Sequence, residues 1–439
     1  MTRIAIIGSG ISGLGCAWLL HRDFDVTVLE ADDRVGGHSH TVTVDEQGRS
    51  VPIDTGFMVF NRVTYPNLVR LFEVLGVPVK RTDMSFSVRC GPHGLEYCGS
   101  SLNHLFAQRR NLLRPSFYRM LLAIDRFNRE AVAALDDPAL RSLSLEEYVR
   151  RRGYGDDFFH LYLIPMSSAV WSTPPERMLE FPAASLLRFF HNHGFLGLHT
   201  QHPWWTVEGG SGVYVERLIA PFRDRVHRGA AVRRIRRMDG AVEVATDREV
   251  QRFDKVVLAC HAPEALALLG DDATAAERRW LSPFRYQPNT AILHTDASVM
   301  PRTRRAWSSW NYRLDSEAAR LGGGRAADST RLATSTHYWM NRLQGVSQRT
   351  NYFVSINGGH LVEPSRILRT LSYEHPLFDG AAVEAQEALP ALNSGARGGT
   401  ETYFAGAWQR YGFHEDGLFS AVRVAELLLG RDPWKGRAA

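Results

Sequence analysis

Six residues near the start of the chain form a glycine-rich turn with the spacing of a dinucleotide-binding motif. Gly8-Ser9-Gly10-Ile11-Ser12-Gly13 follows the apolar run 3–7 and opens the apolar segment 11–21. Glycines at these positions permit a tight turn and a close backbone approach, while the amides of a helix N-terminus face a bound pyrophosphate. Glu30 lies seventeen residues after Gly13, where a carboxylate accepts hydrogen bonds from ribose hydroxyls. These residues predict a dinucleotide site.

The segments around this turn have the periodicity of a strand, a helix and a second strand. The apolar runs 4–7 and 25–30 flank the helical segment 11–21, so together they predict a βαβ unit. A continuous apolar run at 254–259 is typical of a buried parallel strand, and residues 402–429 have the pattern strand, turn, helix. The sequence therefore predicts an α/β fold with a parallel sheet.

Residues 66–202 differ from the rest of the chain in their helical periodicity, aromatic side chains and repeated prolines. We assign them to a separate lobe, since 439 residues exceed what one hydrophobic core usually supports. Segments 286–295 and 352–357 have strand-like compositions and predict a sheet in the same lobe. Gly322-Gly323-Gly324 and its polar neighbours predict a loop.

Two further motifs connect the beginning and the end of the chain to a known family. Arg34-Val35-Gly36-Gly37-His38 follows Glu30, and Asp54-Thr55-Gly56 follows a short strand. The pattern resembles the flavin amine oxidase and phytoene desaturase superfamily, which also contains protoporphyrinogen oxidase. Near the C-terminus, 402–408 and 412–421 resemble that superfamily's second flavin motif, in which helix amides face the flavin pyrimidine ring and stabilise negative charge. Trp204–Gly212 and Val232–Ile235 also resemble its segments that re-enter the FAD domain and brace the adenine side.

The resemblance implies FAD as the cofactor and an amine-oxidase-like architecture. It implies a Rossmann-type FAD-binding domain of residues 1–65, 203–270 and 398–432, with an interleaved α+β substrate domain of residues 66–202 and 271–397. The motifs and the resemblance together assign the FAD contacts to Gly8, Gly10, Ile11, Ser12, Gly13, Glu30, Ala31, Arg34, Gly36, Gly37, His38, Thr55, Gly56, Phe57, Met58, Val232, Ala259, Gly406, Phe413, Gly417 and Leu418.

His38 departs from the family pattern, because many members have an arginine there. The substitution removes a fixed charge beside the expected cofactor. His38 and His40 together lack a third ligand nearby, so we predict no metal site.

The route of electrons out of the flavin follows from the motif count. No second Gly-x-Gly-x-x-Gly follows a strand, so we expect no nicotinamide domain. Electrons should then pass to oxygen or to a quinone-like acceptor. We expect a substrate dehydrogenase or oxidase, in which FAD takes a hydride from carbon and the protein supplies orientation and desolvation.

Three residues are candidates for the chemistry: His294, Trp408 and His414. Amine oxidases of the superfamily commonly hold a water near the flavin with a lysine, but residues 289–296 contain none, which disfavours an ordinary amine oxidase. The chain has three lysines, at Lys80, Lys255 and Lys435. His294 could serve as a base because histidine titrates near neutrality, although a surface or satisfied structural histidine is the simpler interpretation. Core packing explains Trp408 as readily as substrate contact does.

Segment 186–198 is strongly apolar and is typical either of a wall around a long hydrophobic substrate or of buried core. The ending Gly412–Gly417 and His38-Ser39-His40 resemble a bacterial subgroup of FAD-dependent oxidoreductases associated with cyclopropane and methyl-branched fatty-acid modification. That resemblance implies desaturation or oxidation of a lipid acyl chain. The alternatives are an oxidase of amines or other small molecules that releases hydrogen peroxide, an FAD-stabilised partner protein without turnover, and an enzyme that isomerises its substrate on the flavin.

The chain has a net charge of +5, and almost all of its basic residues are arginines. Arg109, Arg110, Arg114 and Arg119 alternate with apolar residues, a pattern that suits anionic lipid head groups, although the solvated face of an ordinary helix is the simpler interpretation. No run reaches the ~20 apolar residues of a membrane span, and no signal peptide or metal-like cysteine spacing is recognisable. We expect reduced cysteines, a cytoplasmic protein with peripheral contact at the inner membrane face as the open alternative, and no nucleic-acid partner.

Overall fold

Strands from both ends of the chain meet in one parallel sheet of the computed structural model, which describes residues 1–197, 200–315, 334–396 and 399–437. The strand order is β10-β2-β1-β14-β20, and every neighbouring pair is parallel. The strands are β1 (Arg3–Ile7), β2 (Asp25–Leu29), β10 (Val226–His227), β14 (Lys255–Leu258) and β20 (Thr402–Phe404). The predicted α/β class with a parallel sheet is confirmed.

The alternation of side chains along β1 explains why this sheet has two covered faces. Ile4 and Ile6 point into one core, while Ala5 and Ile7 point into the other. The first core is covered by α1 (Ile11–Leu20), α2 (Pro66–Val74), α10 (Gly212–Ile219) and α16 (His414–Leu429). The second is covered by β11 (Val232–Met238), β12 (Ala241–Thr246), β13 (Val250–Phe253), α11 (Ala262–Leu269), α12 (Ala275–Leu281) and α15 (Gly380–Gly395).

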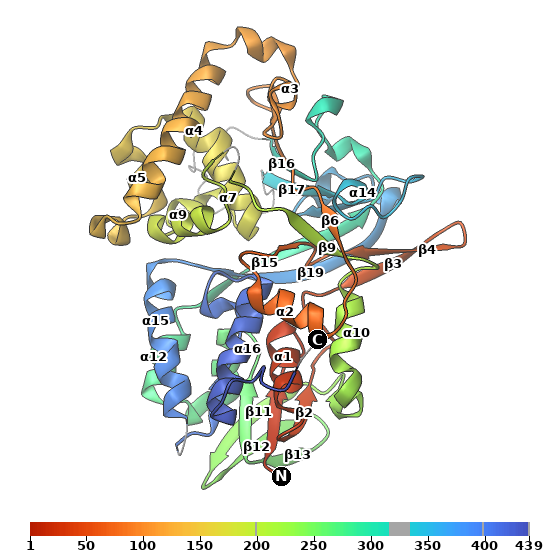
Figure 1. Ribbon diagram of the computed structural model, residues 1–439, viewed down its shortest axis with the longest axis vertical. Coiled ribbons are helices and arrows are strands. Elements are labelled where there is room, and N and C mark those ends of the chain that lie inside the picture. The colour runs from red at the N-terminus through yellow and green to blue at the C-terminus, as the bar shows by residue number, and fades with distance from the viewer. Residues whose placement is uncertain (198–199, 316–333, 397–398, 438–439) are drawn as a thin grey trace.

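The second body contains a seven-stranded sheet of order β19-β15-β18-β17-β16-β7-β8, antiparallel except between β16 and β7. Its strands are β7 (Phe86–Cys90), β8 (Leu95–Cys98), β15 (Arg285–His294), β16 (Trp310–Leu314), β17 (Thr334–Trp339), β18 (Phe353–Ile356) and β19 (Ile367–Leu377). β15 and β18 occupy the two segments that the sequence predicts as strands. Figure 1 shows β15 and β19 crossing between the parallel-sheet body and the upper part of the molecule.

Two small sheets join the bodies. The hairpin of β3 (Thr41–Glu46) and β4 (Arg49–Asp54) packs Val51 and Ile53 against Ala291 and Leu293 of β15. The other small sheet consists of β5 (Phe60–Asn61), β9 (Trp204–Val207) and β6 (Val79–Thr82). Both lie next to segments that the sequence assigns to cofactor binding.

A helical lobe completes the second body (Figure 1), and its core is rich in aromatic side chains. It contains α3 (Leu102–Leu105), α4 (Pro115–Ala134), α5 (Leu145–Arg152), α6 (Asp156–Phe158), α7 (Ile164–Trp171), α8 (Pro175–Leu179) and α9 (Ala183–Asn192). The short helix α14 (Met340–Leu343) lies beside the seven-stranded sheet.

The predicted domain boundaries stay a prediction, but the packing of two helices bears on them. Residues of α12 and α15, placed with the substrate domain from the sequence, share the core of the parallel-sheet body. The predicted loop at Gly322–Gly324 and Leu198 of the apolar segment lie outside the described residues. None of the four cysteines, all of which lie in the described ranges, forms a disulfide, and no helix in these ranges is long and apolar enough to cross a membrane.

Candidate active site

The glycine-rich turn is packed tightly on one side and open on the other. A Cβ atom at Gly13 would lie 1.9 Å from the Gly8 carbonyl oxygen, so this position accepts no side chain. A Cβ atom at Gly10, the residue before α1, would meet no protein atom within 4 Å. The first amides of α1, at Ile11 and Ser12, have no intrahelical acceptor by position. The turn therefore offers free space and unpaired donors where an anion would sit.

Glu30 directly follows β2 and holds this turn through hydrogen bonds. One carboxylate oxygen accepts the Ser9 amide at 2.8 Å and the Ser9 hydroxyl at 2.5 Å, and the other accepts the Asp32 amide at 2.9 Å. The first oxygen thereby uses both of its lone pairs, while the second keeps one for a ligand hydroxyl. A cavity of about 590 Å³ opens at the same end of β2, lined in part by Leu29 and residues 226–230. Ala31 is exposed beside it, and Val232 opens the neighbouring strand β11.

The segment Arg34–His38 folds back onto the glycine-rich turn. The Gly36 amide donates to the Ser9 carbonyl at 2.9 Å, and a Cβ atom on Gly37 would lie 3.0 Å from the Gly10 Cα atom. The Arg34 guanidinium donates to the Gly37 carbonyl at 2.8 Å, which leaves other N–H groups for a phosphate. Two motifs separated by a whole strand therefore form one surface.

His38 carries a buried ring nitrogen, Nε2, with no hydrogen-bond partner in the structure. Its ring centroid lies 5.0 Å from that of Tyr373 and 5.3 Å from that of His375. Burial, and to a lesser degree the neighbouring His375, lowers the pKa of His38 well below its ordinary value. The ring is therefore neutral, and its unpaired nitrogen is the kind of group that a ligand satisfies. The open turn, Glu30 and this nitrogen fit the demands of FAD.

Asp54 connects the second part of the site to distant segments. Its carboxylate accepts the Ser211 amide at 2.8 Å and 2.9 Å, the Thr41 hydroxyl at 2.6 Å and the Gln344 amide group at 2.7 Å. Burial raises the pKa of this carboxyl group above its ordinary value. The following residues pass beside the Arg34–His38 segment.

The backbone at 55–58 is held by hydrogen bonds to that segment. The Thr55 amide donates to the His40 carbonyl and the Phe57 amide to the His38 carbonyl, while the Met58 carbonyl accepts the Thr206 hydroxyl. A Cβ atom at Gly56 would lie 2.1 Å from the His38 carbonyl oxygen.

His414 brings three remote segments together at the start of α16. Its Nε2 atom lies 2.6 Å from the Tyr214 hydroxyl, which is hydrogen-bonded to Ser39, and its ring stacks on Phe57 with centroids 3.9 Å apart. Burial lowers the pKa of His414 to about 3, so the ring is neutral and a weak base. Sequence reasoning missed the roles of Ser39 and Tyr214, although Ser39 lies within the pattern His38-Ser39-His40, because no local spacing relates either residue to His414.

The start of α16 also packs directly on the start of α1. A Cβ atom at Gly417 would lie 2.7 Å from the Ile11 side chain and 2.9 Å from the Ser12 hydroxyl. Leu418 contacts the position of Gly15 in α1. The two helix N-termini that the sequence assigns to phosphate and flavin therefore lie side by side.

The buried side chain of Trp408 supports the loop that precedes α16. It is 2% exposed, its indole N–H donates to the Cys260 carbonyl at 3.1 Å, and its ring lies 4.7 Å from that of Phe284. Cys260 follows Ala259, another predicted cofactor contact, and the Gly406 amide donates to the Ser420 hydroxyl. Of the two explanations for Trp408, the packing favours a structural role.

His294 lies in the seven-stranded sheet and is fully buried. The Asp296 amide donates to its Nδ1 atom at 3.1 Å, so Nε2 carries the proton and donates to the Ser355 hydroxyl at 2.7 Å. Successive residues of a strand point to opposite faces, so His294 faces away from Asn289, which bonds to His375 near His38. Burial lowers the pKa of His294 to about 4. The structure thus places it as a satisfied structural histidine, away from the His414 cluster.

Aromatic side chains of the helical lobe pack against Phe413, the residue before His414, and together with it form what we call the aromatic wall. Phe413 stacks on Phe189 with centroids 4.9 Å apart and lies 6.0 Å from the Trp171 ring. The Trp171 indole N–H donates to the Tyr411 carbonyl at 3.1 Å. Within the predicted apolar segment, Leu186, Leu187, Phe189 and Phe190 are all buried core, and Phe189 also contacts Phe413 of the flavin motif.

Two acidic residues follow His414, and both are engaged by donors. Glu415 accepts the Leu68 amide at 2.9 Å and the amide group of Asn67 at 2.7 Å. Asp416 accepts the Phe413 amide at 3.0 Å, and burial raises its pKa to about 7. Neither carboxylate is left free to bind a cationic substrate.

Comparison with known proteins gives a consistent family. Residues 11–347 match the model of the family described as flavin containing amine oxidoreductase. The Arabidopsis thaliana protein named probable polyamine oxidase 4 is 30% identical over 179 residues, 38% of this chain and 34% of that protein. Polyamine oxidase 4 of Oryza sativa subsp. japonica is 40% identical over 87 residues, 19% of this chain and 17% of that protein. The chain thus aligns with about a third or less of the length of these curated relatives.

Solved structures resemble the chain over nearly its whole length. A CLA-producing fatty acid isomerase from P. acnes has a TM-score of 0.68 at 17% identity, and the match covers 98% of each chain. Cyclohexylamine oxidase from Brevibacterium oxydans has a TM-score of 0.66 at 17% identity, covering 98% of this chain and 99% of the other. At these identities the similarity establishes the fold alone.

Proposed function

Since this chain belongs to the flavin-containing amine oxidoreductase family, we propose that it uses FAD to oxidise or desaturate the acyl chain of a lipid. Membership confirms the predicted resemblance, the FAD-binding fold, the cofactor and the enzyme class, an FAD-dependent oxidoreductase. The lipid substrate, the residues assigned to each role and the domain boundaries are proposals. The observation that carries the substrate proposal is the aromatic wall of Phe413, Phe189 and Trp171.

This wall suits a long apolar substrate better than a charged one. Burying an apolar chain against aromatic rings is favourable, at roughly 25 cal/mol per Å² of apolar surface. A protonated amine at the same place requires an available carboxylate. Glu415 and Asp416 already accept backbone amides, and the lysine of ordinary amine oxidases is absent from residues 289–296. The similarity in fold to a fatty acid isomerase also supports the proposal.

The residues of the site divide the work between binding and orientation. When bound, FAD supplies a two-electron acceptor that takes a hydride from carbon, and its electrons then leave to oxygen or a quinone-like acceptor. The first turn of α1, Glu30 and Arg34 hold the pyrophosphate and ribose. The neutral pair His414 and Tyr214 fixes Phe57 and Ser39 beside the reacting centre, and the aromatic wall excludes water.

Oxidation of an amine is the second candidate, because the curated relatives are polyamine oxidases. Such an enzyme would release hydrogen peroxide with polyamines. Under the lipid proposal, contact with the inner face of a membrane brings the enzyme to its substrate.

Product analysis tests the choice. Purified holoenzyme is incubated in air with micellar phospholipid bearing methyl-branched or cyclopropane chains, and the recovered acyl chains are analysed by mass spectrometry. The lipid proposal predicts chains lighter by two hydrogens, with a double bond. Unchanged lipid together with rapid peroxide release from polyamines would replace it with the amine oxidase.

A further inference from the structure

Five large apolar side chains stand exposed within one short stretch of the helical lobe. The exposed fractions are 76% for Leu102, 47% for Leu112, 89% for Leu113, 42% for Tyr118 and 70% for Leu122. Eleven large apolar residues are exposed among the described residues, so nearly half of them fall within these 21 positions. Figure 1 shows α3 and the start of α4 at the upper end of the molecule, away from the parallel sheet. An exposed apolar cluster of this kind marks an interaction site.

These side chains are not needed for the core of the lobe. The inner face of α4 buries Phe117, Met120 and Phe127, while Tyr118 and Leu122 point outward from the same helix. The core of the lobe is therefore complete without them, and their exposure requires another explanation.

The segment of the chain that carries the cluster contains no acidic residue. Residues 97–124 contain four arginines and no aspartate or glutamate. We call the exposed apolar residues together with these arginines the leucine–arginine tip, made of Leu102, Arg109, Arg110, Leu112, Leu113, Arg114, Tyr118, Arg119 and Leu122.

The arginines of the tip keep their charge available. Arg109 donates to the Phe106 carbonyl and the Asn103 side chain, and Arg110 donates to the Gly94 carbonyl. Arg114 shares a cavity of about 20 Å³ with Asp157. Within the described ranges, none of the four arginines forms an ion pair with a carboxylate.

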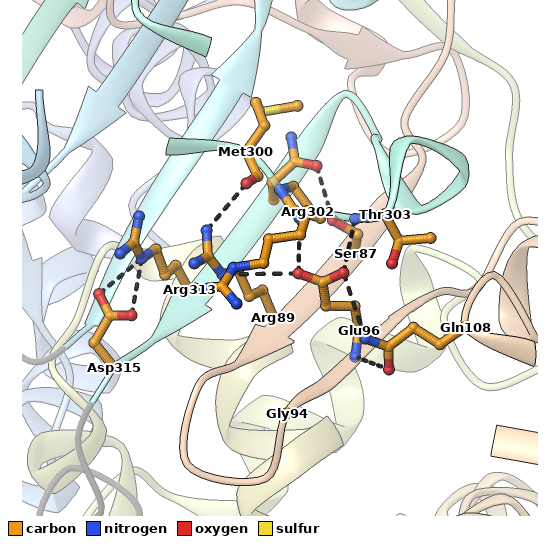
Figure 2. Close-up of polar contacts among 12 residues, drawn as sticks. Ser87, Arg89, Gly94, Glu96, Gln108, Met300, Arg302, Thr303, Arg313 and Asp315 are labelled. Atoms are coloured by element: carbon orange, nitrogen blue, oxygen red, sulfur yellow. Dashed lines mark hydrogen bonds and ion pairs between the residues drawn. The ribbon is translucent and has the colours of Figure 1, made fainter. Parts of the chain in front are cut away.

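The tip is anchored by a buried polar cluster at its base, which Figure 2 shows around Glu96. The Glu96 carboxylate accepts the amides of Arg302 and Thr303, both at 2.8 Å, and lies 3.8 Å from the Arg89 guanidinium. The Glu96 amide donates to the Gln108 side chain at 2.9 Å. Gln108 immediately precedes the turn Arg109–Leu113, so the exposed leucines stand on a fixed support.

We propose that the leucine–arginine tip docks on a bilayer that contains anionic phospholipids. Exposed apolar side chains interleaved with arginines along the chain match a surface whose outer layer is negative and whose next layer is apolar. A protein partner with an apolar helix would need a groove, whereas these side chains project from the end of the lobe. The lobe that docks is also the lobe that supplies the aromatic wall. The benefit of docking rests on the proposed function, but vesicle binding is measurable without turnover.

Vesicle sedimentation of the full-length holoenzyme tests the inference. Wild type should sediment with vesicles of phosphatidylcholine mixed with phosphatidylglycerol and, much less, with phosphatidylcholine alone, and added salt should weaken the binding. Leu113→Ser with Leu122→Ser should reduce partitioning by at least about tenfold, since two side chains lose their apolar contact. Arg109→Gln with Arg119→Gln should lower it by about tenfold and flatten the salt dependence.

Exposed apolar residues elsewhere provide the matched control. Met238→Ser with Val250→Ser alters exposed positions, 38% and 64%, on the three-stranded sheet at the opposite end of the molecule and should bind like wild type. Thermal melting and flavin absorbance verify that every variant is folded. The inference would be overturned if wild type bound vesicles with and without phosphatidylglycerol equally well, or if the tip variants bound like wild type. Binding of the tip to a protein and not to vesicles would also overturn it.

The failures of the two proposals are distinguishable. Lipid in detergent micelles reaches the site without docking, so flavin reduction by micellar lipid without vesicle binding refutes only the tip. Vesicle binding without any reduction by lipid refutes only the lipid substrate.

Discussion

A substitution at Gly10 should weaken cofactor binding without affecting folding. Its backbone has φ −67° and ψ 179°, an extended conformation open to any residue, and a Cβ atom there would touch no protein atom. Gly10→Ala should therefore leave the stability of the apoprotein unchanged while filling the space of the pyrophosphate. We expect FAD affinity to fall by about tenfold or more, measured by fluorescence titration of the apoprotein.

Gly13→Ala supplies the contrast, because its Cβ atom would lie 1.9 Å from the Gly8 carbonyl oxygen. This variant should lower the thermal midpoint of the apoprotein itself. Unchanged FAD affinity in Gly10→Ala would contradict the assignment of the turn to the pyrophosphate.

Asp416 makes the stability of the protein depend on pH near neutrality. Burial raises its pKa to about 7, so between about pH 4 and pH 7 the native state holds a proton that the unfolded chain has lost. Its contribution to stability is therefore present at low pH and decreases as the pH rises through this window, by up to about 4 kcal/mol. Asp416→Asn should remove this part of the slope, measured as the free energy of unfolding in urea at pH 5 and pH 8. Asp136→Asn, at an exposed position, controls for the lost charge.

Equal pH slopes in wild type and Asp416→Asn would show that this carboxyl group is ionised throughout. The hydrogen bond from the Phe413 amide acts in that direction, and burial acts against it.

The sequence alone predicted the contacts between residues that are close in the chain, but not the contacts between remote segments. Glu30 and the glycines are separated by one strand, so their spacing determines their geometry. The partners of His414 come from residues 39 and 214, and no local pattern announces them. His294 is saturated by Ser355, 61 positions away, which is why the sequence could name it as a base without excluding a structural role.

Among the elements, the β3–β4 hairpin links the two bodies through the end of β4. The Asp54 carboxylate there binds Ser211, Thr41 and Gln344, which come from three separate segments. Asp54→Ala would leave several buried donors unpaired, so we expect a loss of about 3 kcal/mol in the free energy of unfolding. Denaturant unfolding followed by tryptophan fluorescence measures it. Asp45→Ala, at an exposed position near the end of β3 in the same hairpin, should cost less than about 1 kcal/mol.

A loss at Asp54 no greater than at Asp45 would refute this linking role. The strands of the parallel sheet were predictable because each is a short apolar run bounded by a motif. The assignment of α12 and α15 was less accessible, because an amphipathic helix shows which face is buried but not against which sheet it packs.

The whole molecule combines an FAD site that the family shares with a helical lobe that we propose selects lipid. The three flavin motifs occupy the beginning, middle and end of the chain, and the structure brings them within one site around α1 and α16. The lobe between them was predicted to be apolar, but its contact with Phe413 depends on a chain reversal that the sequence does not display. For the exposed tip the sequence left lipid contact and an ordinary solvated face open, and the exposed leucines are what the structure adds.

The central claim is that acyl chains deliver electrons to the flavin. The direct measurement is the oxidised-flavin absorbance of the anaerobic holoenzyme after mixing with micellar phospholipid carrying methyl-branched or cyclopropane chains, with polyamines mixed in parallel. We expect the lipid to bleach the flavin and the polyamines to leave it oxidised. Bleaching by a polyamine with no response to lipid would contradict it and would identify the aromatic wall as core packing rather than a substrate surface.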